Sequence, residues 1–212
     1  MQGHSHDNNI SKNAALSHRL MNVTLRAVNQ TSMTMSPFTY KQQIYNHAGQ
    51  RWEAEVQLPP MRRTNAEQWI AWLLSLNGRS GTFLMGDPLG CTARGALGGT
   101  PVVNGASQTG SSISIDGCSN SITAWMKAGD YIQLGAASTA TFHKVLQDVN
   151  TNASGQATLD IWPSIRTAPA DGATVITSNT VGRFRLNAGE QDWSINNASV
   201  YGITFAAVEA IT

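Results

Sequence analysis

The chain carries little charge. Charged residues make up 13% of its 212 residues, about half of the usual share of about 25%. A formal net charge of +1 at pH 7 gives no electrostatic reason to expect binding to nucleic acid or to a membrane surface. A weakly charged chain with 19 glycines favours a protein that packs against copies of itself. A plain soluble β protein is nearly as good an interpretation of composition alone.

Long apolar runs are absent as well. No stretch approaches the roughly 20 consecutive apolar residues of a membrane-spanning helix. Residues Met1 to Asn9 are polar and contain no apolar segment of signal-peptide length, so we do not expect secretion by that route. Residues 1–20 show weak periodicity, and we interpret them as a flexible N-terminal arm.

Metal-ligating residues are few and scattered. The only cysteines are Cys91 and Cys118. In a reducing cytosol they would be free thiols, an interpretation that we favour over a disulfide without excluding the latter. Two cysteines without neighbouring histidines do not make a zinc site. His4, His6 and Asp7 could bind a stray metal, but a polar terminus explains them better.

Short motifs of known catalytic sites are missing. The sequence contains no Gly-x-Ser-x-Gly, no His-Glu-x-x-His and no P-loop. His47 and His143 are far apart in the sequence, and neither belongs to a ligand motif. Asp87-Pro88 is typical of a turn after a strand. We therefore expect no enzyme activity, no cofactor and no metal.

Two pairs of like-charged residues could have a functional role. Glu53 and Glu55 fall on the polar face of one predicted strand and could approach each other. A glycosidase needs a carboxylate pair at a defined separation, but solvated or inter-subunit ion pairing is the simpler interpretation. Arg62-Arg63 is too short a run to argue for nucleic-acid binding.

A β-α-β element is the clearest structural signal. Residues 51–58 alternate and place one apolar face inward, and Pro59-Pro60 ends this strand. A tryptophan-rich helix is expected over about 65–76, Asn77-Gly78 breaks it, and a second strand is expected over 81–88. The inward face of the first strand consists of Trp52, Ala54, Val56 and Leu58.

The expected helix has both a start signal and a buried face. Asn65 or Thr64 is a suitable N-cap, and Glu67 in the first turn suits the helix dipole. One stripe at i, i+3, i+4 and i+7 faces the sheet. Ile70 and Leu74 on the other side are also apolar, which indicates a second burial partner, either another subunit or a covering loop. The stripe consists of Trp69, Trp72, Leu73 and Leu76.

The flanking segments are predicted to be strands. Residues 21–28 alternate, and Asn46–Gly49 is interpreted as the turn of a hairpin that runs from Tyr45 to Trp52. At the other end of the chain, 200–209 alternates clearly and should pair with the early strands to close the first domain. Shorter strands are expected over 183–186 and 193–195.

Between these segments the composition changes. From about 90 to 180, turn clusters such as Gly98–Pro101 separate short apolar runs. Asn152–Gly155 is expected to be a hairpin turn. Five or six short strands at roughly 10-residue spacing predict a compact inserted barrel or sandwich. The runs are 112–115, 131–134, 141–149, 157–162 and 174–176.

The inserted segment holds the aromatic side chains that could contact a glycan. Trp125, Tyr131 and Trp162 are of the type that stacks on sugar rings. A core or interface position is the preferred interpretation of all three.

Several phrases of the sequence resemble tail proteins of tailed bacteriophages. They include Arg51–Val56 followed by Pro59-Pro60-Met61, Gly81–Leu84 followed by Gly86-Asp87-Pro88, and Ala128–Gly135. In layout, residues 21–212 are similar to the distal tail protein family. That resemblance implies an N-terminal β-sandwich with a helix, assembly as a six-fold ring at the end of the tail, and a second β domain.

The resemblance and the pattern together give the following expectations. The fold class is mainly β: a β-sandwich with one packed α-helix plus an inserted small β-barrel or sandwich domain. Residues 21–89 and 181–212 would form the ring domain, and 90–180 the inserted domain. The partners would be copies of itself in a homohexamer, the tail tube protein, the tail hub and receptor-binding or side-tail proteins, with DNA only as passing cargo. The expected assembly residues are Trp69, Ile70, Trp72, Leu74, Tyr201, Ile203 and Phe205.

The resemblance also implies a location and leaves alternatives open. The protein would reside in the virion tail after assembly in the cytoplasm of a bacterial host. The first alternative is a carbohydrate-binding module of a host-adsorption apparatus. The second, which the missing motifs disfavour, is a wall hydrolase.

Overall fold

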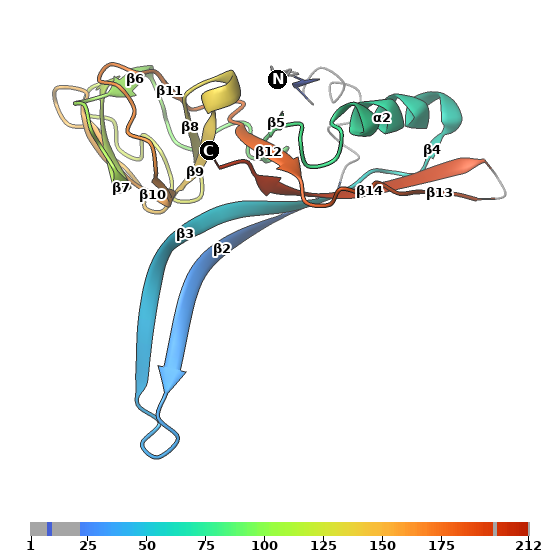
Figure 1. Ribbon diagram of the computed structural model, residues 1–212. Helices are drawn as coiled ribbons and strands as arrows, with labels where there is room; N and C mark the ends of the chain where they lie inside the picture. The colour runs from blue at the N-terminus through green and yellow to red at the C-terminus, as the bar shows by residue number, and fades with distance from the viewer. Residues whose placement is uncertain (1–7, 10–21, 197–198, 212) are drawn as a thin grey trace, which may run out of the picture.

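A computed structural model describes residues 8–9, 22–196 and 199–211 (Figure 1). Strands make up 49% of the structure and helices 9%, which confirms the predicted class of a β-sandwich with one packed helix and an inserted small β domain. Of the expected N-terminal arm, only β1 (Asn8–Asn9) is described, and it pairs in parallel with β5. No helix of the described residues is long and apolar enough to cross a membrane.

The first sheet joins the two ends of the chain. Its strand order is β1-β5-β12-β14-β3-β2, with β4 and β13 also paired to β14. As predicted, the last strand pairs with an early one: Phe205 lies opposite Val56. The strands beyond β1 are β2 (Asn22–Met35), β3 (Gln42–Gln57), β4 (Met61–Arg62), β5 (Phe83–Met85), β12 (Gly182–Leu186), β13 (Trp193–Ile195) and β14 (Val200–Glu209).

Helix α2 (Arg63–Ser75) lies across this sheet and begins earlier than the sequence suggested. Its N-cap is Arg62, and no side chain caps it, so the predicted caps at Asn65 and Thr64 are wrong. The reason is that Arg62 ends β4 and pairs with Val200, which brings the chain to the sheet where the helix starts. Glu67 lies beyond the first turn and forms an ion pair with Arg63 at 3.0 Å.

The apolar side of α2 completes the first core. The ring of Trp72 meets those of Trp69, Phe83 and Phe205 edge to face, at centroid distances of 5.7, 5.2 and 5.8 Å. Such pairs add to the free energy of burial. The predicted inward face of residues 51–58 is buried in the same cluster: Trp52, Ala54 and Val56 of β3, and Leu58 just after it.

The second sheet closes nearly into a barrel. Its order is β11-β8-β9-β10-β7-β6, and a bridge between Val102 and Thr174 brings its two edge strands together. All its strands lie between β5 and β12 in the sequence, so the chain leaves the first sheet and returns to it. They are β6 (Gly99–Val103), β7 (Gly110–Cys118), β8 (Tyr131–Leu134), β9 (Thr141–Val145), β10 (Ala157–Ile165) and β11 (Val175–Ile176).

Strand β6 begins inside a segment that the sequence marked as a turn. Gly99 has a φ of 84° and lies opposite Cys118. A Cβ atom at Gly99 would stand 2.2 Å from the carbonyl oxygen of Gly117. The absence of a side chain at this glycine therefore allows two paired strands to approach closely, and the residue does not form a turn.

Strands β2 and β3 are longer than predicted and form one hairpin. The predicted turn at Asn46–Gly49 is wrong, because β3 runs through it. The chain reverses at Ser36–Lys41, where the Ser36 amide donates to the Lys41 carbonyl at 3.0 Å. Asn46–Gly49 instead lies at a register shift: Gln30 alone faces residues 47–49 of β3. Such an irregularity bends a strand pair, and Figure 1 shows the hairpin curving away from the sheet.

Candidate functional site

The most distinctive surface is the outer part of this hairpin, residues 30–49, which we call the projecting hairpin. Every residue in it except Ser36 is exposed. Phe38 at the turn is 91% exposed. A two-stranded hairpin without further packing is only marginally stable in water, and exposed apolar patches mark interaction sites. Its large exposed apolar or aromatic side chains are Met33, Met35, Phe38, Tyr40, Ile44 and Tyr45.

Three of these six side chains share one face of the hairpin. Met33 lies directly opposite Ile44, and Met35 follows two positions along β2, so the three share a face of the hairpin. Tyr45 pairs with Ser32 on the other face. The projecting hairpin therefore has an apolar face made of Met33, Met35 and Ile44, and Phe38 is exposed at the turn.

The base of the projecting hairpin is fixed by the second sheet. Asn29 and Gln50 form the last cross-strand pair before the register shift. The Trp162 indole donates to Asn29 Oδ1 at 2.7 Å, and the Ser164 amide donates to Gln50 Oε1 at 2.7 Å. The Arg166 guanidinium donates to the Gln50 carbonyl. The inserted domain thus sets the direction in which the hairpin leaves the body.

Trp52 joins the two sheets. It belongs to β3, and its indole Nε1 donates to the Phe142 carbonyl of β9 at 2.9 Å. Its ring lies edge to face with Trp162 at 4.6 Å and tilted against Phe142 at 5.6 Å. This aromatic joint buries apolar area from both sheets, which favours a fixed arrangement of the two.

An ion pair reinforces the joint. Arg166 donates to both carboxylate oxygens of Glu209, at 2.7 and 3.1 Å. Glu209 also accepts the Trp52 amide at 3.0 Å, and its side chain is 6% exposed. A buried carboxylate needs such partners, because its removal from water is costly. The pair ties the inserted domain to the last strand of the chain.

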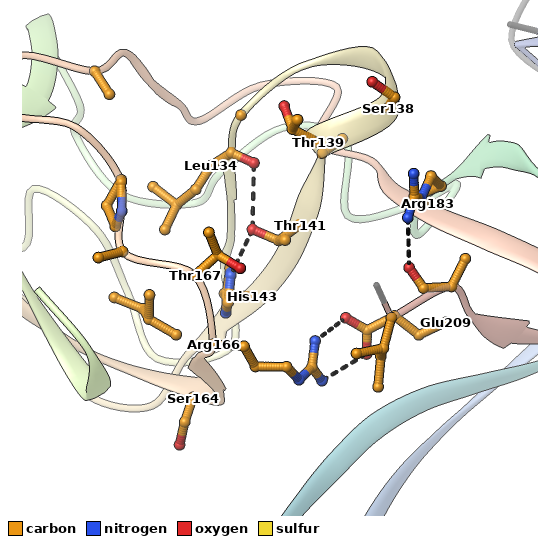
Figure 2. Close-up of a pocket in the computed structure, with 18 of the residues that line it drawn as sticks. Leu134, Ser138, Thr139, Thr141, His143, Ser164, Arg166, Thr167, Arg183 and Glu209 are labelled. Carbon is orange, nitrogen blue, oxygen red and sulfur yellow. Dashed lines mark hydrogen bonds and ion pairs between the residues drawn. The ribbon is translucent and has the colours of Figure 1, made fainter. Parts of the chain in front are cut away.

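A cavity of about 350 Å³ lies beside this ion pair. Figure 2 shows Arg166 and Glu209 facing each other on one side of it, with His143 and Thr141 on another. A volume of this order could hold a small ligand. The charged groups drawn there are already engaged with each other or with backbone carbonyls, which leaves few of them to orient a ligand.

A threonine hydroxyl and a histidine ring are in contact in the cavity wall. His143 Nδ1 donates to the Pro163 carbonyl at 2.6 Å, and its Nε2 lies 2.9 Å from Thr141 Oγ1. Burial lowers the pKa of His143 below its ordinary value. The Thr141 hydroxyl is also within hydrogen-bond distance of the Leu134 carbonyl, at 3.3 Å. A buried ring between two fixed partners is typical of a structural histidine, so we build no reaction on it.

Asp130 closes the loop that precedes β8. It accepts hydrogen bonds from the amides of Lys127, Arg94 and Gly95, and the Arg94 guanidinium donates to it at 3.0 Å. Burial alone would raise the pKa of Asp130, but these hydrogen bonds and the Arg94 charge outweigh it and hold the pKa below its ordinary value. Asp130 is a structural carboxylate.

The carboxylates that could have formed a catalytic pair are also engaged within the chain. Glu53 accepts from Arg51 at 2.6 Å, and Glu55 accepts from Arg26 at 3.1 Å. Both pairs are solvated, where an ion pair contributes roughly 0–1 kcal/mol. Among the described residues, no group of three or more acidic, histidine or cysteine side chains could hold a metal ion.

The structure places most of the expected assembly residues in the core. Buried side chains present little area to a neighbour. Of the α2 residues on the second side, Ile70 is buried within the chain, whereas Leu74 is 58% exposed. The buried residues are Trp69, Ile70, Trp72, Tyr201, Ile203 and Phe205.

The possible glycan residues lie in the core or at the joint. Trp125 and Tyr131 are buried, so their ring faces are closed to a sugar. Trp162 is partly exposed but packs on Trp52 and donates to Asn29. These positions agree with the core interpretation that the sequence favoured.

The cysteines are free thiols. Cys91 is partly exposed, and Cys118 is buried. Burial, with a smaller contribution from the nearby Asp116 charge, raises the pKa of Cys118 to about 11. A thiol with so high a pKa is a poor nucleophile at neutral pH.

Comparison with known proteins gives no family for the chain. No protein-family model matches it, and no curated protein matches it at a significant level.

Sequence reasoning missed the projecting hairpin as a surface. A signal for it was present: residues 30–49 contain Lys41 as their only Lys, Arg, Asp or Glu, yet hold several large apolar residues. The sequence instead predicts that the first strand ends near Val28 and that Asn46–Gly49 is a turn, so the long hairpin between them was not predicted.

Proposed function

We propose that the chain is a structural component of a phage tail tip, where copies of it form a ring that joins the tail tube to the tip hub and to host-recognition proteins. The observation that carries the proposal is the projecting hairpin. Its strands extend beyond the body, and its apolar face is left uncovered by the described residues. Such a surface would promote aggregation of a monomer, whereas in a permanent assembly it is buried in the interface.

The strand edges support the same proposal. Strand β2 pairs with β3 alone, and β13 with β14 alone, among the described strands. Open edges that would risk aggregation in a monomer are satisfied when neighbours in a closed assembly cover them. The weak charge of the chain suits large permanent interfaces, whose centres are depleted in charged residues.

The sequence phrases that resemble those of phage tail proteins supply the context. The resemblance implies that the partners are further copies of the chain, the tail tube protein, the tail hub and receptor-binding or side-tail proteins. DNA would pass through the lumen as cargo. The protein would be assembled in the cytoplasm of a bacterial host and reside in the virion tail.

The test is the mass of the purified chain by light scattering over a concentration series, with negative-stain images of the same peak. A mass near six subunits with annular particles is expected. A particle of about 22.7 kDa at every concentration would contradict a ring that forms by self-assembly.

The carbohydrate-binding alternative has no comparable support. The burial of Trp125 and Tyr131 removes two of the three aromatic rings on which it depended. Among the residues described here, the Arg166 and Glu209 side chains near the cavity are paired with each other, which gives no specific observation in favour of a catalytic role.

A further inference from the structure

A second uncovered surface lies at the other end of the first sheet. Strand β13 pairs with β14 through Trp193 opposite Ile203 and Ile195 opposite Tyr201. Ile203 and Tyr201 are buried, but Trp193 is 38% and Ile195 57% exposed. The outer edge of β13 has no strand beside it among those described. We call Glu190, Asp192, Trp193 and Ile195 the β13 edge.

The charges of the two surfaces are opposite. Lys41, at the turn, is the only Lys, Arg, Asp or Glu of the projecting hairpin. Glu190 and Asp192 immediately precede β13 and are exposed, and residues 187–196 contain no Lys or Arg. Within the described part of the chain, no ion pair reaches Lys41, Glu190 or Asp192.

One copy cannot bring these surfaces together. Figure 1 shows the hairpin bending away from the sheet below β9 and β10, while β13 lies at the far end near α2. The hydrogen bonds at Asn29 and Gln50 hold the hairpin in that direction. A contact between them must therefore join two molecules.

We propose that the apolar face of the projecting hairpin docks on the β13 edge of a second copy of this chain. Met33, Met35 and Ile44 would cover Trp193 and Ile195, and Lys41 would meet the carboxylates of Glu190 and Asp192. Both sides bring an uncovered apolar centre with charge at its margin, the usual arrangement of a protein interface. Opposite charges at the margin fix the register and speed association.

This inference rests on the proposed ring, and it specifies which surfaces of neighbouring copies meet in that ring. It is heterologous, since each copy offers a hairpin to one neighbour and a β13 edge to the other. Heterologous contacts close into a ring when the rotation between copies allows it, and otherwise extend into a filament. The contact and the closure can therefore fail separately.

Cysteine cross-linking tests the contact directly. In a Cys91→Ser background, Met35→Cys is introduced in one preparation and Ile195→Cys in another, and the two are mixed with a short bismaleimide. The control partner is Ser154→Cys, an exposed site on the inserted domain. We expect the Met35→Cys protein to cross-link to Ile195→Cys in large excess over Ser154→Cys. Equal yields, or no cross-link at any concentration, would overturn the contact.

The mass of the same samples separates the two proposals. Cross-linked closed particles support both the contact and the ring. Cross-linked open chains support the contact but not the ring. Closed particles that form without this cross-link keep the ring and overturn the contact.

A charge exchange tests the marginal ion pairs. Lys41→Glu alone, or Glu190→Lys with Asp192→Lys, should raise the dissociation constant by a factor of roughly 2 to 5 at low salt, as an exposed pair allows. Mixing the two variants should restore association between unlike molecules, because the signs are exchanged on both surfaces. No recovery in the mixture would show that these charges do not meet.

Apolar variants test the centre of the contact. Met33→Thr with Ile44→Thr keeps two good strand residues and removes the apolar face, and we expect association to weaken by about tenfold or more. Tyr45→Thr, on the opposite face, is the matched control and should leave association close to that of the wild type. Equal effects of the two changes would refute docking by the apolar face.

Discussion

The inserted barrel and the projecting hairpin are both β structure, but the barrel buries its apolar side chains and the hairpin exposes them. In the barrel, Ile113, Ile115 and Leu159 are fully buried, and the bridge at Val102 joins the edge strands. In the hairpin, Met33 and Ile44 stand opposite each other in the open. The same alternation of residues therefore serves the interior of one region and the surface of the other.

That difference separates residues that stabilise the chain from residues available to a neighbour. A buried side chain contributes to the free energy of folding whatever the protein does. An exposed apolar side chain contributes little to folding, so its free energy is available for association. Variants in the two regions should accordingly affect different measurements.

The largest loss of stability is expected in the first core. Trp72→Ala should reduce the free energy of unfolding by about 3–5 kcal/mol, because the ring packs against three other aromatic rings. Chemical denaturation measures it. Leu74→Ala, on the exposed side of the same helix, should cost less than about 0.5 kcal/mol. A loss below about 1 kcal/mol for Trp72→Ala would refute its core position.

The joint between the sheets should give the next largest effect. Arg166→Met leaves the Glu209 carboxylate buried with the Trp52 amide as its remaining partner, and we expect a loss on the order of 2 kcal/mol. Arg26→Met breaks the solvated pair with Glu55 and should cost at most about 1 kcal/mol. If the two variants lose similar free energies of unfolding, then the buried pair contributes no more to stability than the solvated pair.

Asp130 should make stability depend on pH. Its folded pKa is lowered, so its contribution is fully present above its unfolded value of about 3.9 and is lost as pH falls through the folded pKa. Asp130→Asn should therefore cost on the order of 1–2 kcal/mol at pH 7 and flatten the acid limb of the stability profile. Thermal melts of both proteins from pH 7 down to pH 3 measure this. An unchanged acid limb would contradict the assignment.

The smallest effect on folding is expected in the projecting hairpin. Phe38→Ser should change the free energy of unfolding by less than about 0.5 kcal/mol, since the side chain is almost wholly exposed. The same change should weaken association measured by sedimentation velocity. A clear loss of stability in the dissociated chain would mean that Phe38 packs on its own molecule.

Much of the body could be predicted because its patterns are local. The alternation of Tyr201, Ile203 and Phe205 predicts a strand with one apolar face, although the structure buries this face within the chain rather than leaving it for the expected assembly contact. The tryptophan stripe of the helix and the breakers on both sides of it also act over a few residues. The cap at Asn65 failed because the helix start depends on the pairing of Arg62 with Val200, which is distant in sequence.

The projecting hairpin could not be predicted as a surface, because its exposure depends on whether distant parts of the chain pack against it. Met33 and Val56 occupy alternating strands of similar pattern, but only Val56 is covered. Asn46–Gly49 has the composition of a turn and instead marks a register shift. The apolar second side of α2 suggested an interface, yet Ile70 is buried within the chain. The sequence shows which side chains are apolar, but it does not show which of them are buried in the folded chain.

The hydrogen bonds at Asn29 and Gln50 also have a mechanical meaning. They connect the root of the hairpin to Trp162 and Ser164 of the inserted domain, and the aromatic joint at Trp52 lies close by. In the proposed assembly, a pull on the inserted domain would pass through these two hydrogen bonds to the base of the hairpin, and from there to the neighbouring copy.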